Sequence, residues 1–135
     1  MAVTYSSTLK TNRMQLVADL ISSKVAASST GTASAGSLVI GTSALSGATG
    51  VLATVTLSAT AGTVSGNVFT LSGVPLSVTA SATGTAALAE FRNNAGTVIV
   101  SGLTVATSGG DITINSTSIT SGQTVQVTAG TITHG

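Results

Sequence analysis

The chain has 135 residues, the size of one domain, and carries a formal net charge of +1, with charged residues making up 5% of the sequence. It contains no cysteine, which excludes a disulfide framework and thiolate metal sites. Basic residues are few and are not interleaved with aromatics, so nucleic-acid binding is not indicated. No apolar run reaches the roughly 20 residues that a membrane-spanning helix needs.

The rest of the composition favours a β-rich fold. Aromatic residues make up 2% of the sequence, whereas Thr, Val and Ile, which favour strands, are common. A positive mean hydropathy with a net charge near zero argues against disorder. Because so little charge leaves little repulsion between copies, we expect this protein to work inside an assembly.

The N-terminal segment differs from the rest in charge and in period. Residues 6–24 hold four of the seven charged residues, and residues 25–89 hold none. Apolar residues within residues 8–23 recur at helical spacing, and Ser7 or Thr8 can cap the start of a helix. The sequence therefore predicts a helix at residues 8–23, with one apolar side formed by Leu9, Leu16, Val17, Leu20 and Ile21 and flanked by Met14.

We expect that apolar side to cover a sheet, as amphipathic helices usually do. The charged side of the helix and the preceding arm, residues 1–7, are expected to contact a partner, since a short arm can become ordered on binding. The candidate partner-binding residues here are Tyr5, Lys10, Arg13 and Lys24. Residues 26–36, small and polar, are predicted to form a flexible loop.

From Ser37 onward the apolar period changes to two, which is typical of strands. The predicted strands in this part lie in "SLVIG", "VLATVTLS", "NVFTL" and "VPLSVTASA". Val51, Ala53, Val55 and Leu57 are expected to share one face. Pro75 is expected at the start of a strand or at a sheet edge, because it has no N–H to donate.

The second half of the sequence predicts a hairpin followed by a series of regularly spaced strands. In residues 87–105 two strands flank "NNAG", whose residues tolerate positive φ. Glu90 and Arg92, two apart, should point the same way onto a solvent face or an interface. Arg92 is a candidate for partner contact, since arginine is enriched at interfaces. The tail predicts strands around "DITIN", "STSIT" and "QTVQVTAGTIT".

These elements together predict one domain, residues 1–135, that is mainly β: an antiparallel β-sandwich with one N-terminal α-helix. Strands recur about every 8–12 residues, separated by Gly, Ser and Asn, which is typical of sandwiches and barrels. One helix before about eight strands leaves no room for βαβ units, so antiparallel sheets are expected.

Catalysis is not expected from the residues available. The only histidine, His134, is next to last in the chain, where orientation is hard to maintain. The three acids are Asp19, Glu90 and Asp111, and we expect them to be solvated charges. No cluster suits a metal ion. We therefore predict no enzyme activity, no cofactor, no metal and no small-molecule substrate.

Three stretches carry a resemblance to a known family. They are "STLKTNRMQLVADLI", followed by a Ser/Gly-rich segment and "GSLVIG", then "LAEFRNNAGTVIVSGLTV", and finally "GGDITINSTSITSGQTVQVTAGTIT". In style and order they resemble the capsid decoration, or cement, proteins of tailed phages. The middle of the chain, residues 42–83, contributes only a pattern.

The resemblance implies a jelly-roll-like sandwich without catalytic residues. It implies a virion protein on the outer capsid surface, assembled in the host cytoplasm, that bridges subunits of the major capsid protein. It also implies self-association, with a homodimer favoured over a homotrimer. Neither nucleic acid nor membrane is an expected partner.

The alternative is a component of a phage tail or head fibre, or a bacterial surface or adhesin β-module. Thr/Ser/Gly-rich β domains with few charges suit these roles as well. A carbohydrate-binding module is disfavoured, because such modules present aromatic platforms and this chain has no Trp. The number of copies per particle would separate a cement protein from a tail component.

Overall fold

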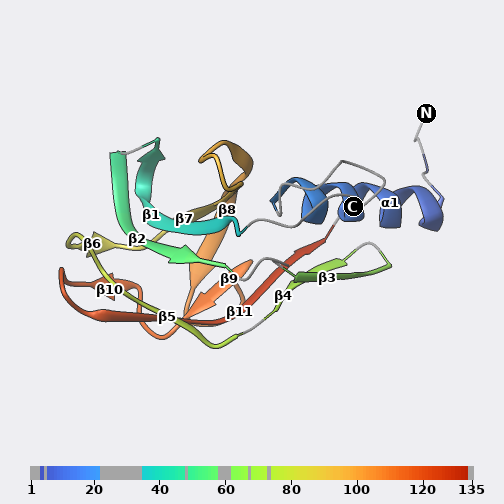
Figure 1. Cartoon of the computed structure of the whole chain (residues 1–135). Coiled ribbons are helices and arrows are strands. Elements are labelled where there is room, and N and C mark those ends of the chain that lie inside the picture. Colours follow the sequence, from blue (N-terminus) through green and yellow to red (C-terminus); the bar gives the residue numbers. More distant parts are fainter. Residues whose placement is uncertain are drawn as a thin grey trace.

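The computed structural model describes residues 4, 6–21, 35–47, 49–57, 62–66, 68–72 and 74–133. They form a mainly β fold with one helix ahead of the strands, α1 (Ser7–Ile21), which confirms the predicted fold class (Figure 1). The predicted arm and the predicted loop at residues 26–36 lie for the most part outside the described residues.

The described residues contain eleven strands rather than about eight. Their bounds are β1 (Ser37–Ser46), β2 (Thr49–Thr56), β3 (Gly62–Ser65), β4 (Val68–Leu71), β5 (Leu76–Thr79), β6 (Gly84–Thr85), β7 (Leu88–Arg92), β8 (Val98–Ala106), β9 (Ile112–Ile114), β10 (Ser118–Ile119) and β11 (Thr124–Thr133).

Nine of these strands belong to one folded-over sheet. Its order is β2-β1-β7-β8-β9-β11-β4-β3, with β5 paired to β11, while β10 and β6 form a small second sheet. Figure 1 shows β1, β2 and β7 above β5 and β11, with β8 running down toward β9. The arrangement is therefore sandwich-like. The long strand β11 continues from the lower layer to β4 and β3, beneath α1.

Pairing between the strands is antiparallel, as predicted, except between β8 and β9. There Val105 lies beside Ile112 and Ala106 beside Thr113 in parallel register. The chain returns through a tight glycine-containing loop that is closed by side-chain hydrogen bonds. The Asp111 Oδ2 accepts hydrogen bonds from the Thr104 backbone N–H at 3.1 Å and from the Thr104 hydroxyl at 3.2 Å.

The start of α1 corrects the sequence prediction by one position. The helix begins at Ser7, and the Oγ of Ser6 accepts a hydrogen bond from the backbone N–H of Leu9 at 3.1 Å. Ser6 is therefore the N-cap, rather than Ser7 or Thr8. Residues 22 and 23, the last two of the predicted helix, lie outside the described residues.

The apolar side predicted for α1 is turned inward only in part: Ile21 and the flanking Met14 are buried as expected, and Val17 packs against the core. Met14, Ala18 and Ile21 are buried in the core, and the helix packs against β3, β4 and β8. Leu9 and Leu20, which were expected to be buried, are 39% and 37% exposed. The helix has two apolar sides. The side that contains Ala18 packs on the sheet, because the small side chain of Ala18 allows a close approach.

The strand patterns behave largely as predicted. In β2 and the residue after it, Ala53, Val55 and Leu57 are buried while Thr54 and Thr56 are exposed. Pro75 directly precedes β5, which pairs only with β11 among the described strands. In the β7–β8 turn the Asn93 Oδ1 accepts hydrogen bonds from the N–H groups of Ala95 and Thr97, and Gly96 has φ +88°.

One buried cluster joins the helix to both layers of the sandwich. Phe69 of β4 and Phe91 of β7 meet edge to face, with ring centroids 5.8 Å apart and an interplanar angle of 80°. Members of the cluster from α1, the upper layer and the lower layer include Met14, Ile21, Leu38, Ile40, Ile112, Ile114, Val125 and Val127. The fold therefore has a continuous core that positions α1 at one end.

Candidate partner-binding surface

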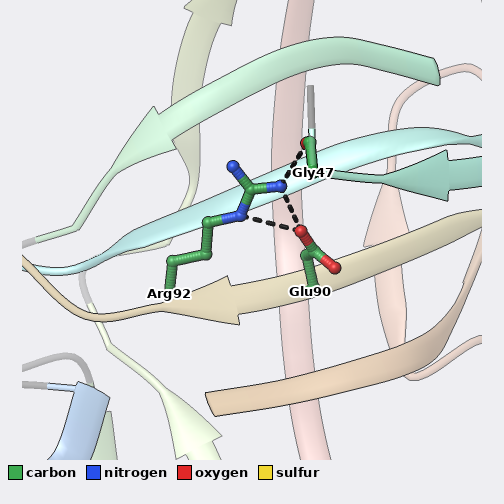
Figure 2. Close-up of polar contacts among 3 residues, drawn as sticks. All are labelled: Gly47, Glu90 and Arg92. Atoms are coloured by element: carbon green, nitrogen blue, oxygen red, sulfur yellow. Dashed lines mark hydrogen bonds and ion pairs between the residues drawn. The ribbon is translucent and has the colours of Figure 1, made fainter. Parts of the chain in front are cut away.

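The candidate residue Arg92 points the same way as Glu90 on β7, as their spacing predicted, and the two form an ion pair that was not predicted. The Arg92 Nε donates a hydrogen bond to the Glu90 Oε1 at 2.7 Å, and the Arg92 Nη2 contacts the same oxygen (Figure 2). The Nη2 also donates to the carbonyl oxygen of Gly47 at 2.6 Å. Gly47 follows β1, so the guanidinium links β7 to the turn between β1 and β2.

A solvent face or an interface was expected for this pair, and the solvent face is not what the structure has. Glu90 is 5% exposed, and the Arg92 side chain is 18% exposed. Val39, the cross-strand neighbour of Glu90 on β1, is also buried. Arg92 and Glu90 are therefore paired within the chain and mostly covered, so that little of their charge faces solvent.

Lys10 and Arg13 lie on α1 and are both partly exposed. The helix has a single acid, Asp19, which is 1% exposed. Its Oδ1 accepts a hydrogen bond from the Gln15 Nε2 at 3.0 Å. Asp19 was expected to be solvated, and that prediction is wrong. With the carboxylate covered and the cations partly exposed, the accessible charge on α1 is positive.

The same helix carries exposed apolar surface. At 3.6 residues per turn, Leu9, Leu16 and Leu20 fall within an arc of about 40°, centred about 150° around the axis from the buried residues Met14, Ala18 and Ile21. Leu9 and Leu20 are exposed and Leu16 is partly exposed. We call Leu9, Leu16 and Leu20 the leucine stripe. Arg13 lies within about 40° of its centre, and Lys10 lies between the stripe and the buried side.

Two other candidates and the histidine have no structural description. Tyr5, Lys24 and His134 lie outside the described residues. The structure thus brings Lys10 and Arg13 together on one helix, and places Arg92 elsewhere, on β7. The proposed roles of these five candidates stay predictions.

The remaining acid has a local role. Asp111 is exposed, as expected, and engages Thr104 through its side chain and also through its backbone N–H, which donates to the Thr104 Oγ1 at 3.0 Å. Within the described ranges, no group of three or more His, Asp or Glu side chains could hold a metal ion. Nor does any helix among these residues have the length and apolarity to cross a membrane.

The leucine stripe is the feature that sequence reasoning missed. Its leucines were recognised by their spacing but were assigned to the core. A signal was present, because Met14, Ala18 and Ile21 recur at i, i+4 and i+7 and define a second apolar side. When one short helix has two apolar sides, one of them can remain exposed to solvent instead of packing in the core.

Comparison with known proteins gives no match: no family model, no curated protein and no solved structure is similar to this chain.

Proposed function

We propose that this chain is a structural protein of a tailed-phage virion, a decoration or cement protein. It binds the outer surface of the capsid and stabilises contacts between subunits of the major capsid protein. The observation that carries the proposal is the leucine stripe on a helix that also carries Lys10 and Arg13, at one end of a β fold whose described surface has little other charge. The resemblance of three stretches to this family is the reason for proposing a phage capsid as the assembly.

Each of the three acids has a partner within the chain. Asp19 accepts from Gln15, Glu90 pairs with Arg92, and Asp111 accepts from Thr104. These contacts give every acid a structural role, which supports a binding function rather than catalysis.

The physical effect of such a protein is mass action. A chain that binds the assembled shell but not its separate subunits shifts the equilibrium toward the shell. Many copies at equivalent positions multiply a modest affinity per site. A Thr-rich β surface supplies hydroxyl and backbone hydrogen bonds with little charge to desolvate. Self-association, as a homodimer rather than a homotrimer, is part of the proposal.

The copy number of the chain in purified virions tests this proposal. We expect a number close to that of the major capsid protein, measured by quantitative mass spectrometry of intact particles with the capsid protein as internal standard. Particles lacking the chain should lose their genome at a lower temperature than complete particles. A copy number near that of tail proteins would instead favour a tail or fibre component, and absence from virions would favour the bacterial surface module.

A further inference from the structure

Part of the sheet forms a series of strands that almost returns to its start. From β2 the paired order runs through β1, β7, β8, β9 and β11 to β5. The two end strands, β2 and β5, lie beside each other, and the pairing directions around the series make them antiparallel. Among the described residues no strand pairing joins them. The series is therefore a barrel with one open seam, between β2 and β5.

The seam is joined at one end. The carbonyl oxygen of Leu52 accepts hydrogen bonds from the Ser81 backbone N–H at 2.8 Å and from the Ser81 hydroxyl at 3.2 Å. Leu52 belongs to β2, and Ser81 follows the end of β5 by two residues. This contact has the direction of a bond between neighbouring antiparallel strands, so the seam is closed here and open beyond it.

Backbone groups of β2 face the seam beyond that contact. Successive residues of a strand direct their N–H and C=O groups to opposite sides. The N–H of Leu57, just after β2, donates to the carbonyl oxygen of Gly36, just before β1. Counting back by two from Leu57 shows which residues bond toward β1, and Thr54 and Thr56 are the residues between them. Their backbone groups therefore point away from β1, toward β5.

Backbone groups of β5 face the same seam from the other side. The N–H of Ala80, just after β5, donates to the carbonyl oxygen of Gln123, just before β11. By the same alternation, the backbone groups of Ser77 and Thr79 point away from β11, toward β2. Two strand edges with complementary donors and acceptors thus lie opposite each other.

The residues on both edges suit pairing. In the register set by Leu52 and Ser81, moving two residues along each strand places Thr54 opposite Thr79. All four seam-facing residues are exposed and uncharged, and none is proline. Neither like charges nor a missing backbone donor therefore opposes pairing, and threonine pairs across antiparallel strands are stabilising.

We propose that this seam closes and reopens, and that closure pairs β2 with β5 to complete the barrel. This inference goes beyond the proposed function and does not depend on it. In the open state, the backbone groups of two uncharged strand edges can bond to a strand of another molecule, whereas the closed state has no edge on this side. Closure therefore controls whether this side of the fold accepts a further strand.

Disulfide trapping tests closure, because the natural chain has no cysteine. A disulfide needs Cα atoms about 4.4–6.8 Å apart, as directly opposite strand positions are. Thr54→Cys/Thr79→Cys should therefore lose its free thiols under mild oxidation in dilute solution. Thr54→Cys/Ser77→Cys is the matched control, because its two positions face the seam but are offset to about 7–8 Å. It should keep its thiols. Thiol titration and mass spectrometry measure both.

Hydrogen exchange tests the open state. The amides of Thr56 and Ser77 take no part in the cross-link and should exchange rapidly in the natural chain. In the cross-linked variant their exchange should slow about tenfold, because closure gives each a backbone hydrogen bond. Reduction of the disulfide should restore rapid exchange. Circular dichroism of each variant establishes that it is folded.

The outcomes separate this inference from the proposed function. Equal cross-linking of the two cysteine variants, or none in either, overturns the inference, since β2 and β5 then do not pair in this register. Slow exchange of Thr56 and Ser77 in the natural chain also overturns it, because the seam would then be covered at all times. The copy number in virions tests the proposed function alone and leaves the seam unaffected.

Discussion

The carboxylate of Glu90 is buried away from water, and its contacts define the structural role of Arg92. Its Oε1 contacts two nitrogens of the Arg92 guanidinium, which also reaches the carbonyl of Gly47. Removing one partner of a buried pair leaves an uncompensated charge, whereas replacing both partners with apolar residues is often neutral. The main effect of the pair is therefore that each buried charge neutralises the other.

A double-mutant cycle on Glu90 and Arg92 should show this asymmetry. Arg92→Met is expected to lower the free energy of unfolding by about 2–3 kcal/mol, because Glu90 stays buried without its cation. The double variant Glu90→Leu/Arg92→Met should lie within about 1 kcal/mol of the natural chain. Urea unfolding measures all variants. Additive losses in the double variant would show that the two side chains do not compensate each other.

At the scale of single elements, α1 shows how apolar residues of similar size act differently on two sides of a helix. Met14 lies in the core, 2% exposed, while Leu20 is 37% exposed six positions later. Truncating a buried side chain loses its transfer free energy and leaves a cavity, whereas truncating an exposed one loses little of either.

Met14→Ala should therefore cost about 2–4 kcal/mol of unfolding free energy, and Leu20→Ala less than about 1 kcal/mol. Both substitutions introduce alanine into the same helix, so differences in helix propensity contribute little to the comparison. Urea unfolding of the two variants side by side gives the two losses. Equal losses would place Leu20 in the core and remove the leucine stripe.

The elements also show which parts of this fold were predictable. Alternation in Ala53, Val55 and Leu57 identifies β2, because burial on one face imposes a period of two. The Asn93–Gly96 turn identifies the β7–β8 hairpin, because asparagine supplies the local hydrogen bonds and glycine supplies the positive φ. Both features depend on residues close together in the chain.

Features that depend on distant residues were not predictable. β3 has no apolar alternation of its own and is defined by its antiparallel pairing with β4. Which side of α1 faces inward depends on its packing against β3, β4 and β8. The sequence of the helix alone does not specify that packing. In the candidate site, the common direction of Glu90 and Arg92 was predicted from their spacing, but their ion pair was not. The link to Gly47 was not predicted either, because it joins residues 45 apart in sequence.

For the whole molecule, the continuous core has a consequence for unfolding. The helix with β3 and β4 occupies one end, and the upper layer lies at the other. The edge-to-face contact of Phe69 and Phe91 connects them within one buried cluster. Parts that share buried surface unfold together, whereas parts with few shared contacts open separately.

We therefore expect one cooperative transition. Methyl NMR signals of Met14 in α1 and Ile114 in β9 should disappear at the same urea concentration. Phe69→Leu should lower both midpoints equally, by about 1–2 kcal/mol in unfolding free energy, since it loses ring volume and the aromatic contact. Val98→Ala, at an exposed position on β8, serves as the control and should move neither. If the Met14 signal disappeared first, α1 would unfold independently of the sandwich. The affinity of any partner that binds α1 would then be reduced by the free energy needed to keep the helix folded.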